Sequence, residues 1–309
     1  MRIYKPKFWN KKNSILSILL SPISVFLRIF VTFKNKITKT RIFNIPVICV
    51  GNIYIGGTGK TPLSITIANE LKKNNKNPII IKKYYKNHKD EHELINEKVS
   101  ALILDSKRSR ALEEAEKRKF NVAILDDGFQ DYSIKKKIEI LCFNSKQLIG
   151  NGHVFPSGPL RENINSVKRC QIVVINGSKN EEFEKKILSI SNNIKIFYSK
   201  YVPSNIDVFK NKKLFAFAGI GNPKNFFDLL IENGLNLEKH LSFPDHYNFS
   251  KSELEKMISI SSKSNLELIT TEKDYHRIKD YKLKNIKCFK TELKILEKEK
   301  FMSQILSLL

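Results

Sequence analysis

The sequence predicts an α/β protein with a parallel sheet flanked by helices, a smaller C-terminal α/β subdomain and an N-terminal membrane-associated helix. The main observation is a series of apolar runs at 47–50, 78–81, 101–104, 122–125, 138–143 and 171–175, with helical segments such as 109–119 between several of them. The runs are continuously apolar, which is typical of parallel strands covered on both faces. A second observation is a glycine-rich turn after the first run, at the strand end where such sheets bind ligands.

The first element is the segment 14–33, which is almost entirely apolar. Lysines flank it on both sides, and Phe8 and Trp9 precede it, where aromatic rings favour a membrane interface. On a helix its polar residues share one face and form a narrow stripe of Ser14, Ser17, Ser21, Ser24 and Arg28.

Three interpretations of this helix are open. The narrow stripe and basic flanks favour a helix seated deeply in a membrane interface. The length, twenty residues at ~1.5 Å each, also suits one span of a ~30 Å hydrocarbon layer, although Arg28 is costly there. A buried amphipathic helix of a soluble protein is the third alternative. The segment lacks the small-residue cleavage pattern of a secretory signal.

The stretch 53–62 (IYIGGTGKTP) joins the first apolar strand to a predicted helix at 63–71, which is the context of a phosphate-binding loop, or P-loop. Glycines let backbone N–H groups close around a phosphate, and the helix N-terminus adds partial positive charge. Lys60 is expected to reach the outer phosphates and Thr61 to hold Mg²⁺. Tyr54 replaces the first glycine of the usual motif. The residues predicted to bind the nucleotide are Gly56, Gly57, Thr58, Gly59, Lys60 and Thr61.

A second signal is the apolar strand 122–125, which is followed by Asp126 and Asp127. A strand that ends in acid is the usual partner of a P-loop, because the carboxylate holds Mg²⁺ directly or through water. Neighbouring strand residues point to opposite sides, so we expect one aspartate to serve the metal and the other a neighbour. Taken alone, the pair is also compatible with a helix cap or turn.

A third unusual stretch is 150–162 (GNGHVFPSGPLRE), called here the GNG loop. Its three glycines and two prolines predict a rigid, irregular path. Rigid loops at strand ends often carry function, and Arg161 is suited to clamp a phosphate with two hydrogen bonds. A purely structural loop is an equal alternative.

Two charged clusters contain further candidate groups. The cluster 89–93 (KDEHE) is by itself typical of a solvated helix start, and Asp245-His246 is typical of a turn. A phosphotransferase needs a carboxylate near the acceptor hydroxyl, and a histidine can assist it. These patterns alone do not select either cluster.

A second block of elements begins near position 195, after a surface helix predicted at 179–193. Its strands are predicted at 214–218, 266–270 and 286–289, and its helices at 226–232 and 250–262. We therefore expect a membrane-associating helix in 1–40, a P-loop core in 41–200 and an α/β subdomain in 201–309.

The formal net charge of +24 first suggests nucleic acid or an anionic membrane. The lysines are spread along the whole chain and no nucleic-acid motif appears, so we expect no nucleic-acid partner, and no obligate protein partner is evident. The four cysteines, Cys49, Cys142, Cys170 and Cys288, are isolated, which favours small buried residues in a reducing compartment.

Taken together, the motifs resemble those of the tetraacyldisaccharide 4′-kinase family, the lipid A 4′-kinases of Gram-negative bacteria. The segments that carry the resemblance are VGNIYIGGTGKTP, ILDDGFQ, GNGHVFPSGPLRE, FAFAGIGNPKNFF, FPDHYNFS and TTEKDYHRI. They follow the family order and cover most of the chain after position 46. DDGFQ combined with the GNG loop is highly specific, whereas a P-loop alone is not.

The resemblance implies a kinase that transfers the γ-phosphate of ATP to the 4′-hydroxyl of a lipid A disaccharide 1-phosphate. It also implies a monotopic enzyme on the cytoplasmic face of the inner membrane, in contact with anionic lipid. Asp90 is implied to be the catalytic base, with His246 and Lys60 also catalytic. The implied Mg²⁺ residues are Thr61, Asp126 and Asp127, and the implied substrate-binding residues are Gln130, Asn151 and Arg161.

The chain departs from the family pattern in two regions. Where the family has Ser-Arg-Gly-Tyr-Gly, this chain has Lys-Lys-Tyr-Tyr-Lys at 82–86, and the glycine of the following acidic motif is Lys89. After DDGFQ, the usual His-Arg is Asp131-Tyr132. The P-loop lysine and the acidic pair are unchanged, so we expect an active enzyme with a trimmed site.

Other P-loop functions fit less well. A partitioning ATPase at a membrane surface is the alternative function, but its deviant loop carries a signature lysine where this chain has Ile55. A GTPase needs Asn/Thr-Lys-x-Asp, and 271–274 (TEKD) has the wrong order. A non-enzymatic membrane adaptor does not need the intact P-loop lysine and acidic pair.

Overall fold

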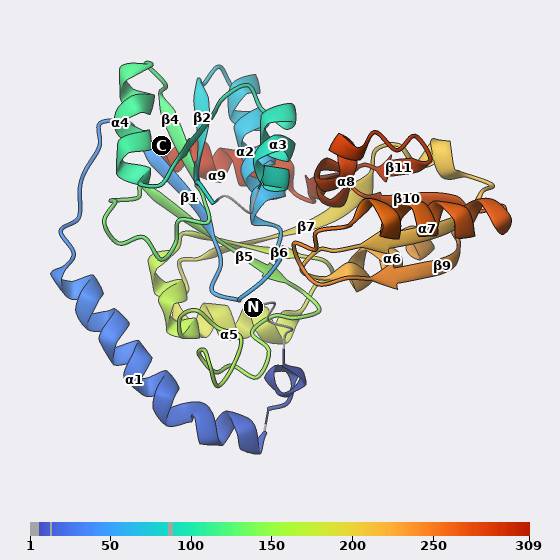
Figure 1. The fold of residues 1–309 in the computed structure, drawn as a ribbon. Coiled ribbons are helices and arrows are strands. Elements are labelled where there is room, and N and C mark those ends of the chain that lie inside the picture. The colour runs from blue at the N-terminus through green and yellow to red at the C-terminus, as the bar shows by residue number, and fades with distance from the viewer. Residues whose placement is uncertain (1–5, 13, 86–88) are drawn as a thin grey trace. The chain divides into compact units, whose positions relative to one another are not determined.

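The computed structural model describes residues 6–12, 14–85 and 89–309 (Figure 1). The chain forms two compact units. The core unit contains Ile3–Tyr84, Val99–Lys200 and Leu293–Leu309, and the C-terminal unit contains Tyr85–Lys98 and Tyr201–Glu292. The short segment 85–98 therefore groups with the second block of the sequence, and the last residues of the chain group with the first. The boundaries expected at 40 and 200 stay a prediction.

The core unit is built on an eight-stranded sheet with the order β12-β7-β6-β5-β1-β4-β2-β3. The pairings from β7 to β3 are parallel, as the continuous apolar runs predict. The strands are β1 (Val47–Gly51), β2 (Pro78–Lys83), β3 (Leu102–Asp105), β4 (Val122–Asp126), β5 (Ile138–Asn144), β6 (Ile172–Asn176), β7 (Lys195–Pro203) and β12 (Thr291–Ile295).

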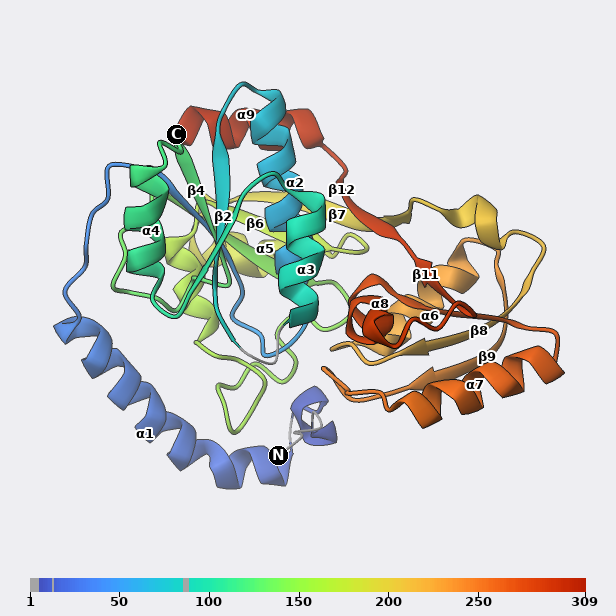
Figure 2. The ribbon, with the colours of Figure 1, turned by 45° about the horizontal axis from the view of Figure 1, so that its top comes forward.

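Helices cover both faces of this sheet (Figure 2). On one face, Val47 and Cys49 of β1 share an apolar cluster with α4 (Arg108–Lys117) and α5 (Glu181–Ile190). The alternate β1 residues therefore face the other side, where α2 (Lys60–Lys73) packs beside α9 (Lys298–Leu308). The predicted α/β class with a parallel sheet flanked by helices is confirmed.

The strand order brings two of the predicted motifs together. After β1 the chain passes through α2 to β2, which lies toward the β3 edge of the sheet. After β4 it turns back to β5, which lies toward the β12 edge. The last residues of β1 and β4 are paired, with Val50 opposite Asp126. Open α/β sheets bind ligands at such a reversal of strand order, outside the carboxyl ends of the strands.

The C-terminal unit has a four-stranded parallel sheet with the order β11-β10-β8-β9. Alternate residues of β8 face opposite layers: Leu214 and Ala216 pack toward α6, whereas Phe215 and Phe217 pack toward α7. Helix α3 packs against α8 within the same unit. The elements are α3 (Lys89–Lys98), β8 (Lys213–Ala218), α6 (Pro223–Glu232), β9 (Asn236–Ser242), α7 (Lys251–Lys263), β10 (Glu267–Thr271), α8 (Glu272–Ile278) and β11 (Ile286–Phe289).

The predicted strands and helices each correspond to an element of the structure, and the sequence interpretation missed β7, β9, β12, α8 and α9. Strand β9 shows why: most of its residues are exposed at the sheet edge, so its sequence, NLEKHLS, lacks an apolar run. The remaining short helices are η1 (Lys7–Asn10), η3 (Ile164–Arg169), η4 (Ile206–Phe209) and η5 (Lys279–Tyr281).

The N-terminal helix α1 (Ile15–Ile37) exposes its apolar residues. Its large exposed side chains range from 45% (Val25) to 75% (Ile15) exposure, whereas Ser17 and Ser24 are buried. The serine stripe therefore faces the protein, and the alternative of a buried core helix is wrong. In the described part of the chain, α1 is the one helix long and apolar enough to cross a membrane.

Trp9 is buried rather than placed as a membrane anchor. Its indole N–H donates to the Pro156 carbonyl at 3.1 Å, and its ring packs edge-on against Phe155. Its backbone carbonyl accepts from the N–H of Asn151 at 2.8 Å. Trp9 thus packs against the GNG loop, which corrects the expectation of an interfacial ring at this position.

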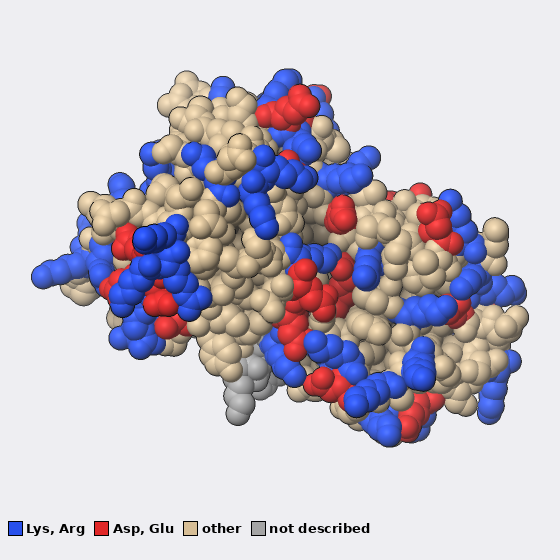
Figure 3. Space-filling view, turned by 90° about the horizontal axis from the view of Figure 1, so that it is seen from above, with Lys and Arg blue, Asp and Glu red and all other residues tan. Residues whose placement is uncertain are grey.

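The distribution of the basic side chains and the state of the cysteines agree with the expectations from the sequence. Lys and Arg side chains are scattered over the face seen in Figure 3 rather than gathered in one patch. Cys49, Cys142 and Cys170 are buried and Cys288 is half-buried, and all are free thiols. Burial raises the pKa of Cys49 and of Cys170 to about 12, so these thiols are small packing residues, as predicted.

Candidate active site

The P-loop has the predicted strand, turn and helix. Helix α2 begins at Lys60, and Gly59 caps it in the left-handed conformation (φ 94°, ψ 14°), which glycine adopts without strain. The Asn52 side-chain amide braces the loop by donating to the Gly56 carbonyl at 3.1 Å and the Thr58 hydroxyl at 3.0 Å. These bonds fix the shape of the loop. The first backbone N–H groups of α2, which have no partner within the helix, therefore follow a preformed loop.

The P-loop is joined to the GNG loop by backbone hydrogen bonds. The N–H of Ile55 donates to the Pro159 carbonyl at 2.8 Å, and the N–H of Arg161 donates to the Ile53 carbonyl at 2.6 Å. Tyr54, which replaces the usual glycine, is 2% exposed and belongs to the apolar core. Two motifs about a hundred positions apart are thus held together, and the buried Tyr54 pairs with Leu160 at their junction.

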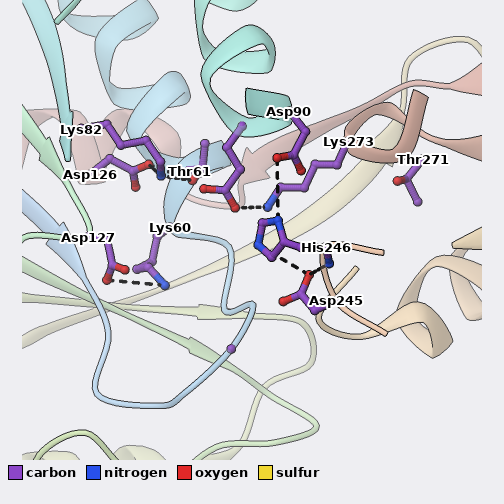
Figure 4. A network of polar contacts seen from close by, with 12 residues as sticks. Lys60, Thr61, Lys82, Asp90, Asp126, Asp127, Asp245, His246, Thr271 and Lys273 are labelled. Atoms are coloured by element: carbon purple, nitrogen blue, oxygen red, sulfur yellow. Dashed lines mark hydrogen bonds and ion pairs between the residues drawn. The ribbon is translucent and has the colours of Figure 1, made fainter. Parts of the chain in front are cut away.

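Asp126 lies at the end of β4 and faces α2 (Figure 4). The Thr61 hydroxyl donates to its Oδ2 at 2.8 Å, and the Ser64 hydroxyl donates to its Oδ1 at 3.4 Å. The Lys82 ammonium also donates to Oδ2 at 2.5 Å. The carboxylate is fully buried, so these three groups account for its burial as a charged residue.

Asp127 faces a different neighbour because the chain turns after β4. Its φ of 60° is a left-handed conformation that aspartate tolerates, and its N–H donates to the Val50 carbonyl at 2.9 Å. Its Oδ1 lies 3.7 Å from Lys60 Nζ (Figure 4). The same oxygen lies 2.8 Å from Arg161 Nη1. The two aspartates therefore diverge, as expected, toward separate partners.

Electrostatics keep Asp127 charged. Burial raises its pKa, but the cations of Lys60 and Arg161 outweigh this and hold the pKa of Asp127 well below its usual range. Burial in turn lowers the pKa of Lys60, and the Asp127 carboxylate opposes that shift. Arg161 Nη1 also lies 3.3 Å from Gln130 Oε1, and Gln130 Nε2 donates to the Asn52 carbonyl at 3.0 Å.

The oxygen donors of this cluster fit Mg²⁺ bound together with phosphate. Thr61 Oγ1 and Asp126 Oδ2 lie 2.8 Å apart. Among the residues that the structure describes, no group of three or more His, Cys, Asp and Glu gathers as a metal site. A hydroxyl and one carboxylate suit Mg²⁺, which keeps several water and phosphate ligands, better than a cation that needs a full protein cage.

Asp90 lies in the first turn of α3 but is not solvated: it is 3% exposed. Its Oδ2 accepts from Arg277 Nε at 3.0 Å and from Nη2 at 2.6 Å. The same guanidinium donates to Asp274 at 2.6 Å and to the Gly219 carbonyl at 2.7 Å. The helix start predicted for 89–93 is present, and its aspartate is buried in an ion pair.

His246 lies next to Asp90 in the C-terminal unit (Figure 4). It occupies a turn with φ 55°, and its N–H donates to the Gly219 carbonyl at 3.1 Å. Its Nδ1 is 3.7 Å from Asp90 Oδ1 and 3.4 Å from Arg277 Nη2. Burial raises the pKa of Asp90, but the His246 contact and the Arg277 charge outweigh it and hold that pKa well below its usual range.

The local sequence explains how Arg277 is placed. The Thr271 side chain caps α8 and accepts from the Asp274 N–H at 3.2 Å. Asp274 and Arg277 are three residues apart, so they share one face of the helix. Arg277 lies inside the TTEKDYHRI motif, but its role was not assigned from the sequence. The available signal was an arginine one turn after an aspartate on a capped helix.

The side chain of Asn151 is hydrogen-bonded to other residues of the protein. Its Nδ2 donates to Ser17 Oγ at 2.9 Å and to the Ser157 carbonyl at 3.0 Å, and its Oδ1 accepts from the His153 N–H at 3.1 Å. A side chain at Gly158 would meet Asn151 Oδ1 at 2.2 Å, so only glycine fits there. Asn151 holds the GNG loop to α1, and its role in substrate binding stays a prediction.

The residues that depart from the family pattern are also paired. Asp131 bonds Arg108 at 3.2 Å, and Arg108 donates to the Asp127 carbonyl at 2.7 Å. The Tyr132 hydroxyl donates to Glu162 at 3.0 Å, and its ring stacks with the Arg169 guanidinium. These departures build an internal network beside Asp127 and leave its contacts with Lys60 and Arg161 in place.

Comparisons with known proteins agree with these motifs. A family model described as Tetraacyldisaccharide-1-P 4′-kinase matches residues 16–309. A tetraacyldisaccharide 4′-kinase of Pelagibacter ubique is 44% identical over 314 residues, covering 100% of this chain and 99% of the relative. One from Rickettsia akari is 32% identical over 311 residues, covering 96% and 94%.

A solved structure has the same fold. The crystal structure titled "apo" form LpxK from Aquifex aeolicus in complex with ATP superposes with a TM-score of 0.70 at 23% identity, covering 95% of this chain and 99% of that one. The fold and the full-length sequence match agree, and the chain belongs to the tetraacyldisaccharide-1-P 4′-kinase family.

Proposed function

We propose that this protein transfers the γ-phosphate of ATP to the 4′-hydroxyl of a lipid A disaccharide 1-phosphate. The observation that carries this is the arrangement at the carboxyl ends of β1 and β4, where Thr61 contacts Asp126 and Lys60 faces Asp127. Membership of the kinase family supplies the identity of the acceptor. The partitioning ATPase remains the alternative that an assay must distinguish.

The core unit supplies the nucleotide half of the proposed reaction. The preformed loop offers backbone N–H groups to the phosphates, and Lys60 places a partly buried positive charge beside them. The proposed Mg²⁺ residues are Thr61 and Asp126, with Asp127 holding Lys60 and Arg161 in place. Mg²⁺ bound there would neutralise phosphate charge that develops during transfer.

The C-terminal unit supplies the acceptor half. The His246 contact and the Arg277 charge keep the Asp90 carboxylate ionised, so it is available to accept a hydrogen bond from the acceptor hydroxyl. His246 lies beside it and is placed to orient the hydroxyl or relay its proton. In protein kinases a carboxylate placed beside the acceptor accepts the proton of the substrate hydroxyl, and Asp90 is proposed to do the same here.

Substrate contacts are proposed for Arg161 and Gln130. Arg161 belongs to the GNG loop and reaches Asp127 through one nitrogen, Nη1. Gln130 is hydrogen-bonded both to Arg161 and to Asn52, the residue that braces the P-loop. These bonds preorganise a guanidinium for an anionic group of the lipid, since an oriented side chain loses less entropy on binding.

Helix α1 is proposed to lie in the cytoplasmic leaflet of the inner membrane as a monotopic anchor. Its serine stripe bonds the GNG loop: Ser24 Oγ donates to the Val154 carbonyl at 2.9 Å, and Ser17 Oγ accepts from Asn151. The outer apolar face is left for lipid, and the flanking lysines add about 1 kcal/mol each near an anionic surface.

A transfer assay tests the proposed reaction. Purified enzyme in detergent is incubated with Mg²⁺, γ-labelled ATP and the disaccharide 1-phosphate, and label is followed into lipid with the acceptor omitted as a control. We expect label in the lipid and little hydrolysis without it. Hydrolysis of ATP with no lipid label would instead match the partitioning ATPase.

A sedimentation assay tests the membrane anchor. Serine at Leu19, Phe26 and Phe30 removes three large outward side chains of α1 and is expected to release the protein from anionic vesicles. A matched variant places serine at Ile42, Ile231 and Leu296, which are exposed apolar residues outside α1, and should sediment like the wild type. Equal sedimentation of both variants would exclude α1 as the anchor.

A further inference from the structure

Lys82 occupies a position that the proposed reaction does not explain. It lies on β2 and is 6% exposed, and strand register sets it directly beside Asp126 of β4. Its Nζ is 2.5 Å from Asp126 Oδ2 and 3.4 Å from Thr61 Oγ1 (Figure 4). Lys82 opens the stretch 82–86, in which the sequence departs from the family pattern.

The ammonium bridges the same two oxygen atoms that suit a divalent cation. Thr61 Oγ1 and Asp126 Oδ2 form the hydroxyl and carboxylate pair, and Lys82 donates to both. An ammonium and a metal ion cannot hold the same carboxylate oxygen at close range, because two positive charges a few ångströms apart repel strongly in a buried site. Binding of one therefore requires the other to leave.

The surrounding charges keep Lys82 in place when no metal is bound. Asp126 is fully buried, and a buried carboxylate without a cation is strongly destabilising. Lys60 and Arg161 are already directed at Asp127, which leaves Lys82 as the cation that compensates Asp126 among the described residues. Lys82 thus compensates the Asp126 charge in the metal-free protein, as a metal ion would when metal and nucleotide are bound.

We propose that Lys82 is a resident cation that competes with the divalent metal for the Thr61–Asp126 pair and so sets the metal concentration at which the nucleotide complex forms. Lys82 is a positioning residue, because it acts through Asp126. The proposal rests on the proposed nucleotide-binding function of the core unit. It predicts that removing the ammonium strengthens metal binding rather than weakening it.

Metal binding is measured directly with Mn²⁺, from its electron paramagnetic resonance signal, in the presence of a non-hydrolysable ATP analogue. Lys82→Met should lower the Mn²⁺ concentration for half-saturation about tenfold, while Lys82→Arg, which keeps a cation, stays near the wild type. Lys83→Met is the matched control, since its side chain points to the opposite face of β2 and should change nothing. Unchanged or weaker Mn²⁺ binding by Lys82→Met overturns the proposal.

Two further measurements guard against a folding defect. Lys82→Gln keeps a hydrogen-bond donor, and Mn²⁺ with the analogue should raise its melting temperature more than that of the wild type; an equal shift counts against competition. In the wild type, the rate at which Lys82 is acetylated is followed by mass spectrometry. This rate should change at least threefold when Mn²⁺ is added to the protein with the analogue. An unchanged rate would mean that the ammonium does not move, which overturns the proposal.

The assay also separates this inference from the function on which it rests. A wild-type protein that binds no analogue at any Mn²⁺ concentration would refute nucleotide binding itself. A wild-type protein that binds the analogue, with Lys82→Met giving the same Mn²⁺ titration, would refute only the competition.

Discussion

The two sets of candidate residues differ in the balance of charge that each unit presents. On the core unit, among the described residues, three cations face two carboxylates: Lys60, Lys82 and Arg161 against Asp126 and Asp127. On the C-terminal unit, Asp90 and Asp274 share the Arg277 guanidinium. A surplus of cations suits a triphosphate, and a surplus of carboxylate suits a hydroxyl that loses its proton. The contrast assigns one half of the proposed reaction to each unit.

The two sets also differ in how the chain assembles them. The core set follows from strand register, because β1, β4 and β2 end side by side and carry their polar residues with them. The C-terminal set joins α3, the turn at His246 and α8, which are far apart in the sequence and are connected by side-chain contacts. We expect substitutions to affect binding on the first unit and turnover on the second.

The largest expected effect is on turnover by Asp90→Asn. The amide cannot accept the hydroxyl proton, and general base catalysis contributes about 10²–10⁴-fold, so we expect kcat to fall about 10³-fold. Nucleotide affinity, measured by fluorescence titration, should stay within about twofold, because the Kd reports only the core set. Loss of nucleotide binding by Asp90→Asn would contradict the assignment of binding to the core unit and turnover to the C-terminal unit.

The next effect is on the stability of the C-terminal unit. Arg277→Met leaves Asp90 and Asp274 buried without their shared cation, which should cost about 3 kcal/mol of unfolding free energy in urea. Lys279→Met is the matched control: its ion pair with Glu93 is partly exposed and should be worth under about 1 kcal/mol. Equal losses would show that Arg277 is not the cation that supports this set.

Lys60→Met tests the other side of the comparison. Removing one preorganised positive charge from the phosphate site should lower kcat/KM about 10²-fold, with weaker nucleotide binding as part of the loss. The pattern is the reverse of Asp90→Asn, which leaves affinity intact. A variant that keeps wild-type affinity for the ATP analogue and loses only kcat would place Lys60 in the chemical step alone.

Contiguous motifs account for what was predictable from the sequence. Lys60, Thr61 and the two aspartates follow apolar runs directly, and parallel strands bring such ends together, so both the sheet and this cluster were predicted before the structure was known. The resemblance to a family added Asp90 and His246. Their proximity in the structure agrees with that pairing, while their catalytic roles stay a proposal.

What the sequence left open depends on tertiary contacts. A buried lysine such as Lys82 reads like any other lysine in a chain this basic, because its partner lies on a strand 44 positions away. The serine stripe of α1 shows which face is polar, but not that this face would bind the GNG loop. Arg277 was hidden for the same reason, since its carboxylate partner Asp90 comes from another segment.

The smallest expected effect is on acid stability. The folded-state pKa of Asp90 is held below the ordinary value of 3.8, so its ionised form stabilises the folded protein. That contribution is fully present above the ordinary pKa and is lost as the pH falls below it toward the folded value. Between pH 5 and pH 3 the wild type should lose about 1 kcal/mol more unfolding free energy than Asp90→Asn.

Urea titrations at pH 5, 4 and 3 measure this difference, with Asp280→Asn as the matched control. The Asp280 side chain is 70% exposed and pairs with Lys89 in solvent, so its replacement should leave the wild-type pH slope unchanged. Asp127→Asn should flatten the slope in the same direction as Asp90→Asn, because cations hold the Asp127 pKa low as well. Parallel slopes for the wild type, Asp90→Asn and Asp127→Asn would mean that neither unit holds its carboxylate in the ionised form, and the contrast in charge between them would lose its physical basis.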